Sequence, residues 1–234
     1  MNRLFTILLL IVLGANLHAK VYVVSVGVAD YPGSKNDLRI SDVDAQTIAR
    51  IYEKNGNAEA KTIVNDQATI ASVLATMSTT FSQANADDTI ILYFSGHGTP
   101  GALACFDGLL PYKDVFSLFK AIRASKKIII ADACYTGKMR TSNRHATTYS
   151  KENVMMFLSS RNNEPSQETK FRNSLFTIFL ERGLRGGADS NNDRLITAKE
   201  LYDFVHDGVS KASSGKQHPV MWGKFDNNMI IINW

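Results

Sequence analysis

The chain has 234 residues, of which 44% are hydrophobic and 21% are charged. These values are ordinary for a globular protein, and the length suits one large domain or at most two small ones. The net charge is only +4, and no cluster of Lys and Arg is interleaved with aromatic residues. The sequence therefore gives little support to a role in binding nucleic acid or a membrane surface.

Residues 1–19 have the features of a secretory signal peptide. Arg3 gives a positive start, Leu4 to Leu13 form an apolar run, and Ala19 offers a small residue for cleavage. The run is shorter than the roughly 20 residues that cross a bilayer, and no later segment is apolar enough to do so. We therefore expect an exported protein, periplasmic or secreted, with no membrane span after signal removal; an uncleaved anchor is the alternative. We expect the mature chain to act as a monomer.

Strands and helices are expected to alternate along the mature chain, residues 20–234. The β-branched run from Val21 to Val28 predicts a buried strand. Ser41 and Asp44 have the spacing of a capping box, which predicts a helix that ends before Gly56. Further strands are expected at 61–64, 89–94, 127–131, 154–158 and 229–232, and further helices at 70–81, 115–122, 175–184 and 197–209. This order predicts an α/β fold with a mostly parallel sheet and helices on both faces.

A polar segment divides this domain in two. Residues 138–152 are rich in Ser, Thr, Asn and basic residues, and they separate a first part, 20–137, from a second part, 153–234. Proteolysis concentrates in exposed polar segments. We expect an exposed linker here, with Lys138, Arg140, Arg144 and Lys151 as candidate sites of self-cleavage.

Two strong strands end in residues that can do chemistry together. His97 follows the strand at 89–94, Cys134 follows the strand at 127–131, and one helix separates the two. The carboxyl ends of parallel strands meet at one edge of a sheet, so we expect the two side chains to be neighbours. A thiol beside a histidine can become a thiolate and attack an acyl carbon, and the backbone N–H groups of Gly98 and Cys134 could hold the resulting oxyanion. Ordinary core packing is the alternative for both side chains.

The segments around these residues resemble known motifs. Residues 93–98, Tyr-Phe-Ser-Gly-His-Gly, resemble the histidine motif of caspases and metacaspases, and residues 132–137, Asp-Ala-Cys-Tyr-Thr-Gly, resemble their cysteine motif. A caspase signature has Gln two residues before the Cys and Gly two residues after it. Here Asp132 replaces the Gln and Gly137 comes one residue later, as in metacaspases and bacterial caspase-like proteins. Residues 41–45, 159–161 and 176–177 and the stretch 189–200 extend the resemblance over nearly all of the mature chain.

The resemblance implies a caspase-like fold and a cysteine endopeptidase that acts on proteins or peptides. His97 would be the general base and later the acid, and Cys134 would form the acyl-enzyme. Ser159 and Ser160 resemble the strand edge against which a substrate backbone pairs.

The resemblance also carries over a specificity pocket, made of Asp44, Ser95 and Asp132. Two carboxylates in a pocket call for a cationic partner, which predicts cleavage after Arg or Lys. Asp44 could instead serve only to cap its helix, whereas Asp132 has no competing structural role. The alternative specificity is cleavage after Asp, for which Arg39 and Arg161 would supply the positive charge.

Two other classes of function stay open. A catalytically silent binding module on the same fold is one, although such relatives commonly lose one member of the pair His97 and Cys134. A thiol redox protein, or a disulfide, built on Cys105 and Cys134 is the other; these are the two cysteines of the chain, and they form no Cys-x-x-Cys motif.

A calcium site is the last alternative. Asp189, Asn191, Asp193, Thr197 and Glu200 have the spacing of an EF-hand loop. However, Arg194 stands where the loop requires Gly, and Thr197 with Glu200 also has the spacing of a helix capping box. Metacaspases often bind calcium at an acidic cluster near Asp114, but here its neighbour is Lys113. We therefore expect no metal and no cofactor.

Overall fold

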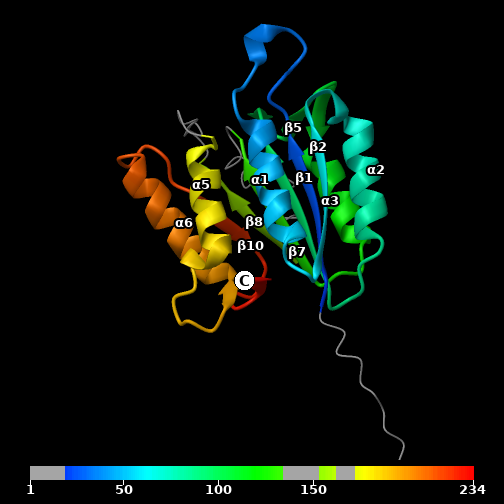
Figure 1. Cartoon of the computed structure of the whole chain (residues 1–234). Helices are drawn as coiled ribbons and strands as arrows, with labels where there is room; N and C mark the ends of the chain where they lie inside the picture. Colours follow the sequence, from blue (N-terminus) through cyan, green and yellow to red (C-terminus); the bar gives the residue numbers. More distant parts are fainter. Residues whose placement is uncertain (1–18, 134–152, 162–171) are drawn as a thin grey trace, which may run out of the picture.

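The computed structural model describes residues 19–133, 153–161 and 172–234. In these residues six strands form a central sheet in the order β10-β8-β7-β3-β1-β2 (Figure 1). Their bounds are β1 (Val21–Gly27), β2 (Ala58–Val64), β3 (Thr89–Ser95), β7 (Lys126–Asp132), β8 (Val154–Leu158) and β10 (Val220–Gly223). Every neighbouring pair is parallel except β8 with β10, which confirms the mostly parallel sheet.

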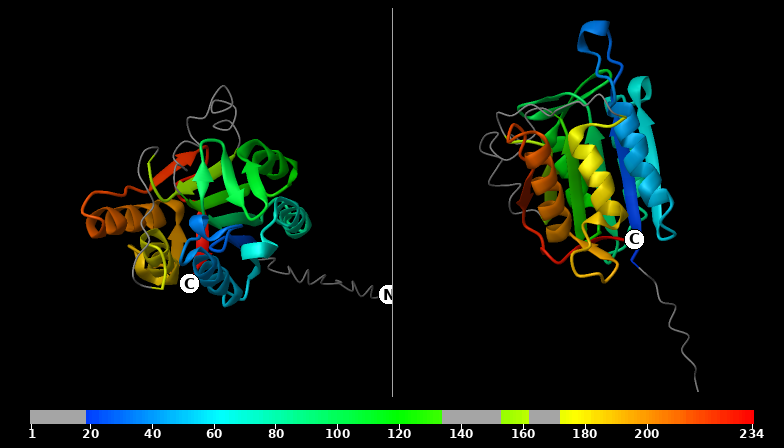
Figure 2. Two further views of the ribbon diagram at one scale, coloured as in Figure 1. Left: turned by 90° about the horizontal axis from the view of Figure 1, so that it is seen from above. Right: turned by 60° about the vertical axis from the view of Figure 1, so that its left-hand side comes forward.

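Helices cover both faces of this sheet, as the alternation of elements predicts (Figures 1 and 2). The helices α2 (Ile70–Phe81) and α3 (Tyr112–Ala121) pack on one face, and α1 (Ser41–Glu53), α5 (Leu175–Arg182) and α6 (Ala198–Ala212) pack on the other. Successive side chains of β3 alternate between the two cores: Ile90, Leu92 and Phe94 face α2 and α3, whereas Ile91 and Tyr93 face the other layer. A strand buried on both faces needs apolar residues at every position, which explains the uninterrupted apolar runs.

The sequence pattern does not predict most of the short elements; the exception is the strand expected at 229–232, which forms at Ile230–Asn233. The strands β4 (Gly98–Thr99), β5 (Ala102–Cys105) and β6 (Gly108–Pro111) form a small antiparallel sheet directly after His97. The strand β9 (Leu195–Thr197) pairs with β11 (Ile230–Asn233), and the short helices are η1 (Ser34–Asn36), η2 (Asn65–Gln67) and η4 (Gly183–Gly187). Segments of two to five residues are too short to show a periodicity.

Only one of the two predicted capping boxes forms. The box of Thr197 and Glu200 is confirmed, with the Thr197 hydroxyl and the Glu200 carboxylate each bonded to the other residue's backbone N–H. The box of Ser41 and Asp44 is wrong, because the N-cap of α1 is Ile40 and no side chain caps this end. Asp44 is fully buried, and its carboxylate accepts hydrogen bonds from other parts of the chain.

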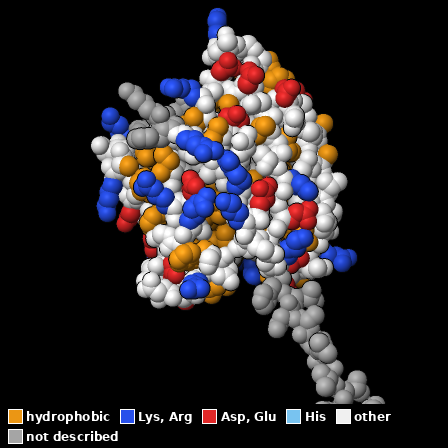
Figure 3. All heavy atoms as spheres, in the orientation of Figure 1, with side chains coloured by type: hydrophobic (Ala, Val, Ile, Leu, Met, Phe, Trp, Pro, Cys, Tyr) orange, Lys and Arg blue, Asp and Glu red, His pale blue; other side chains and the backbone are white. Residues whose placement is uncertain are grey.

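Lys and Arg side chains gather over α1 and α5 on the face shown in Figure 3. Arg50 and Arg182 lie in the last turns of these two helices. A cation at this end of a helix interacts favourably with the partial negative charge of the free carbonyls. Helix termini therefore account for the positions of these two arginines. Residues 1–18 of the expected signal peptide and the whole linker 138–152 lie outside the described residues.

No helix in the described part of the chain is long and apolar enough to cross a membrane.

Candidate active site

The two motifs meet at one edge of the central sheet. Ser95, the last residue of β3, lies opposite Asp132, the last residue of β7, and the Gly96 N–H donates to the Asp132 carbonyl over 3.1 Å. His97 follows one strand tip, and Ala133 follows the other. Cys134 comes next in the sequence and lies outside the described residues. The structure thus places the histidine motif beside the first two residues of the cysteine motif.

The ring of His97 has a defined hydrogen-bond partner. Its Nε2 lies 2.8 Å from the carbonyl oxygen of Asn36, at the end of η1. A carbonyl can only accept, so Nε2 carries the proton when the ring is neutral. The other nitrogen, Nδ1, then has a free lone pair and can take a proton from a partner. This tautomer is the one that a general base requires.

Tyr31 fixes the main chain of His97, a contact that the sequence did not predict. Its hydroxyl accepts from the His97 N–H over 2.8 Å and donates to the Ala104 carbonyl over 3.0 Å. The Tyr31 ring also lies against the His97 ring, with 5.0 Å between centroids. Gly96 makes room for this arrangement, because a Cβ there would sit 2.8 Å from the Tyr31 hydroxyl. Burial raises the pKa of this hydroxyl well above its usual value.

Removing this hydroxyl should slow catalysis without unfolding the protein. In Tyr31→Phe the half-buried His97 N–H loses its acceptor, and we expect peptidase kcat to fall about tenfold with little change in KM. Tyr112→Phe is the matched control, since Tyr112 is also buried and its hydroxyl donates to the Thr99 carbonyl of the same small sheet over 3.1 Å. An equal loss of kcat in both variants would show that the Tyr31 contact is general to the small sheet and does not act on His97.

The three predicted pocket residues lie together beneath the strand tips. The Ser95 hydroxyl donates to Asp44 Oδ2 over 3.1 Å, and Ser95 is the register partner of Asp132. All three side chains are buried, with 0% of Asp44, 2% of Ser95 and 4% of Asp132 exposed. Two carboxylates from α1 and β7 therefore share one buried site.

Donors from the other half of the chain complete this site. The Asn173 side-chain amide donates to Asp44 Oδ1 over 2.8 Å, and the Ser174 N–H donates to the same oxygen over 3.0 Å. The Ser174 hydroxyl donates to Asp132, and the Thr177 hydroxyl lies 3.5 Å from the same Asp132 oxygen. Asp132, for which the sequence suggested no role besides the pocket, is therefore bonded to residues at the start of α5. Ser174 is the N-cap of α5, a residue type that the helix pattern could have suggested, but its contact with the carboxylates could not be predicted.

Burial and mutual repulsion oppose ionisation of this pair. Burial and, second to it, the nearby charge of Asp132 raise the pKa of Asp44 to about 7, even though the hydrogen bonds from Asn173, Ser174 and Ser95 lower it. The pair therefore carries its full negative charge above neutral pH and loses part of it on acidification. An arriving cation would favour the charged form.

The remaining predicted residues take different positions. Ser159 and Ser160 follow the tip of β8 and are fully buried; the Ser159 N–H donates to the Ala131 carbonyl, and its own carbonyl accepts from the Gln217 side chain over 2.9 Å. Their hydroxyls have no hydrogen-bond partner in the described part of the chain. Gly98 opens β4 and lies opposite Leu103. The roles predicted for these backbone groups toward a substrate stay predictions.

The arginines of the alternative specificity lie on the surface. Arg39 and Arg161 are both exposed, whereas the two pocket carboxylates are buried. The free energy that a charge contributes to specificity depends on how far it is removed from water. The charged side chains that are buried at this site are Asp44 and Asp132, so the two carboxylates are better placed than the two arginines to select a substrate by charge.

The loop from Asp189 to Glu200 is held together by its own hydrogen bonds. The Asp189 carboxylate accepts from the N–H groups of Asp193 and Arg194 and from the indole of Trp234. Glu200 bonds Ser190 as well as its capping partner Thr197. Within residues 19–133, 153–161 and 172–234, no three His, Cys, Asp or Glu side chains are grouped so that they could hold a metal ion.

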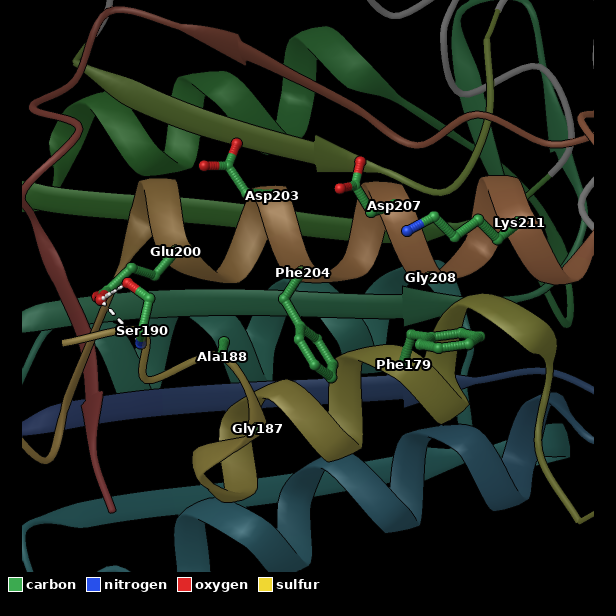
Figure 4. A pocket seen from close by; sticks show the side chains of 10 residues that line it. All are labelled: Phe179, Gly187, Ala188, Ser190, Glu200, Asp203, Phe204, Asp207, Gly208 and Lys211. Carbon is green, nitrogen blue, oxygen red and sulfur yellow. Dashed lines mark hydrogen bonds between the residues drawn. The ribbon is translucent and has the colours of Figure 1, made fainter. Parts of the chain in front are cut away.

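A separate groove of about 420 Å³ lies between α5 and α6 (Figure 4). Phe179 and Phe204 lie at its floor, and Asp203, Asp207 and Lys211 of α6 lie at its rim (Figure 4). None of the residues that line it belongs to the strand tips, so it is distinct from the site of His97.

Comparisons with known proteins agree with this fold. The structure of a protein from Geobacter sulfurreducens is similar with a TM-score of 0.67 and 17% identity, covering 88% of this chain and 94% of that one. Caspase-1 from Spodoptera frugiperda is similar with a TM-score of 0.66 and 15% identity, covering 91% of this chain and 88% of the other. Among curated proteins no sequence match is found. The family model of the caspase domain (Peptidase_C14) matches residues 20–229. The chain therefore belongs to the caspase-domain family of cysteine peptidases, as the motifs predict.

Proposed function

We propose that this protein is a cysteine endopeptidase that cleaves proteins or peptides after Arg or Lys, with Cys134 and His97 as its catalytic dyad. The observation that supports the specificity most directly is the pair of buried carboxylates, Asp44 and Asp132, at the strand edge that carries His97. Buried carboxylates are costly unless a cation or a set of donors meets them. Asp44 Oδ2 accepts one hydrogen bond from the described residues. A carboxylate oxygen can accept two, so Oδ2 could also accept one from a substrate.

The proposed reaction uses the two catalytic residues in turn. His97 Nδ1 takes the thiol proton of Cys134, and the thiolate attacks the carbonyl carbon of the scissile bond. The N–H groups of Gly98 and Cys134 stabilise the oxyanion, which collapses as the C–N bond breaks and His97 protonates the leaving amine. A water molecule, deprotonated by His97, then hydrolyses the thioester, which releases the acid product and regenerates the thiol. The Asn36 carbonyl, bonded to Nε2, stabilises the imidazolium that forms in each step.

A peptide panel tests this function. We would incubate the mature protein with matched fluorogenic peptides that end in Arg, Lys, Asp or Asn. We expect cleavage of the Arg and Lys peptides and at least a hundredfold lower kcat/KM for the Asp peptide, since a carboxylate would be repelled by the pair. Preference for the Asp peptide would overturn the specificity and favour the arginine-based alternative. No cleavage of any peptide, with an intact fold and a reactive thiol, would favour the silent binding module.

We expect this activity to be independent of calcium. The acidic loop at 189–200 satisfies its carboxylates with its own N–H groups and with Trp234, and Arg194 stands at the position that an EF-hand gives to Gly. Peptidase activity should therefore be the same within about twofold in EGTA and in added calcium. A loss of tenfold or more in EGTA, restored by calcium, would contradict this prediction.

We further propose that the protein is exported and acts outside the cytoplasm as a monomer. The features that support export are the positive start, apolar run and small cleavage residue at 1–19. Amino-terminal sequencing of the protein recovered outside the cytoplasm should begin close to Lys20.

A further inference from the structure

We infer that Asn173 and Ser174 are positioning residues of the specificity pocket: they hold Asp44 and Asp132 as hydrogen-bond acceptors and so determine how strongly the pocket binds an Arg side chain. This inference rests on the proposed function for its substrate. Both residues lie directly before α5, and they are far along the chain from the two carboxylates that they contact.

The hydrogen bonds show how the two carboxylates are linked. Ser174 is bonded to both, since its N–H donates to Asp44 Oδ1 over 3.0 Å and its hydroxyl donates to Asp132. Asn173 adds a second donor to the same Asp44 oxygen, at 2.8 Å, and its amide also reaches the Thr47 hydroxyl over 3.1 Å. These two donors share Asp44 Oδ1, whereas Asp44 Oδ2 accepts from the Ser95 hydroxyl. The orientation of Asp44 is therefore set from the α5 side of the pocket.

The same donors offset the charge of the pair. Ser174 is the N-cap of α5, and its hydroxyl also accepts from the Thr177 N–H over 3.0 Å. The N-terminus of a helix carries a partial positive charge, which stabilises nearby anions. In a buried site two carboxylates repel one another, and without donors one of them would bind a proton. The hydrogen bonds from these donors stabilise the ionised form of both. A pocket that holds a proton at neutral pH would bind a guanidinium weakly.

The ionisable groups around Asp44 come from two strands, β7 and β3. Asp132 faces it from β7 and raises its pKa, and Tyr93 lies near both carboxylates on β3, where burial and the two carboxylates raise the pKa of its hydroxyl. The Tyr93 hydroxyl is bonded to Thr177 over 2.6 Å. Since these neighbours are acidic or neutral, the donors that lower the pKa of Asp44 are Asn173, Ser174 and Ser95.

A purely structural role of Ser174 as a helix cap makes a different prediction. Loss of a cap costs stability but leaves the pocket unchanged. Thr69 supplies the control, because it is the N-cap of α2 and accepts from the Ser72 N–H over 3.1 Å, outside the pocket. Thr69→Ala and Ser174→Ala should therefore lower the melting temperature by similar amounts, and only the second should change the kinetics.

The first experiment compares steady-state kinetics on an Arg peptide. We expect Ser174→Ala and Asn173→Ala each to lower kcat/KM about tenfold, mainly by raising KM, with the rate of Cys134 alkylation unchanged. Ser174→Thr keeps a hydroxyl and should restore most of the loss. In both alanine variants the acidic limb of the kcat/KM profile should move to higher pH, because a carboxylate that loses a donor holds its proton more tightly. Unchanged KM and an unchanged pH profile in both variants would overturn the inference.

The second experiment does not depend on activity. Carbon NMR of labelled aspartate can follow the titration of Asp44, whose pKa is about 7 in the wild type, and we expect a higher midpoint in Asn173→Ala. If the wild type fails to cleave Arg peptides but this midpoint rises, the proposed function is wrong and the positioning role holds. If the wild type is active but neither KM nor the midpoint changes, the proposed function holds and the inference is wrong. Asn173→Ala leaves the cap of α5 intact, so the test stands even if Ser174→Ala does not fold.

Discussion

Cys134→Ala should abolish peptidase activity, whereas Cys105→Ser should keep most of it. Cys134 is the thiol that follows the tip of β7, and without it no acyl-enzyme can form. Cys105 is 3% exposed, and burial raises the pKa of its thiol to about 12, so it is protonated and inert at neutral pH. We expect a fall of at least about a thousandfold in kcat for the first variant and less than about threefold for the second.

The measurement is hydrolysis of an Arg peptide under reducing conditions, with circular dichroism to establish that each variant is folded. Alkylation of the native protein should label Cys134 and leave Cys105 unmodified until the protein is unfolded. Equal loss of activity in the two variants would refute the assignment of the nucleophile. A disulfide found between the two cysteines would favour the redox alternative.

Asp132→Asn should have the second largest effect, on binding of the substrate. The amide keeps the shape of the carboxylate and can still accept from Ser174, but one negative charge is lost. Loss of a hydrogen bond to a charged group costs about 1.5–3 kcal/mol, which corresponds to a roughly ten- to hundredfold lower kcat/KM for Arg peptides. Arg should be hydrolysed as well as or better than Lys by the wild type, because its planar fork can contact two carboxylates.

The pH profile of this variant should shift in the opposite direction to that of Asn173→Ala. The charge of Asp132 raises the pKa of Asp44, so its removal lets Asp44 ionise at lower pH. We expect the ionisation of Asp44, whose pKa is about 7, to set the acidic limb of kcat/KM in the wild type, and this limb should therefore move to lower pH in the variant. The rate of Cys134 alkylation serves as the control and should not change. A variant with full activity on Arg peptides would show that the pair does not bind the substrate's cation.

Long regular elements could be predicted from the sequence because their patterns are local. The strand predicted at 127–131 is β7, Lys126–Asp132, which has one more residue at each end. The helix predicted at 70–81 is α2, which has the same bounds. The strand predicted at 61–64 was too short, since β2 begins at Ala58, and its first three residues are all only half-buried. Such edge strands show little of the apolar pattern that marks a central strand.

The partners of the site could not be predicted, because they depend on how distant elements pack. Asn173 and Asp44 are 129 residues apart, and the contact exists only because α5 packs against α1 on one face of the sheet. Tyr31 reaches Ala104, 73 residues away, through a loop with no periodic pattern. The capping box expected at Ser41 and Asp44 was wrong for the same reason, since the carboxylate that would cap the helix is used by tertiary contacts.

The pairing of β7 with β8 has a consequence for a chain that is cut between them. Five residue pairs, from Lys127 with Val154 to Ala131 with Leu158, join the polypeptide before the segment 134–152 to the polypeptide after it, and both strands are buried. The contacts of Asn173 and Ser174 with Asp44 and Asp132 add a second connection. A nicked molecule would therefore run as two bands on a denaturing gel but elute as one particle in size-exclusion chromatography. The two fragments should also reassemble when they are produced as separate polypeptides in the same cell, in the manner of a split protein.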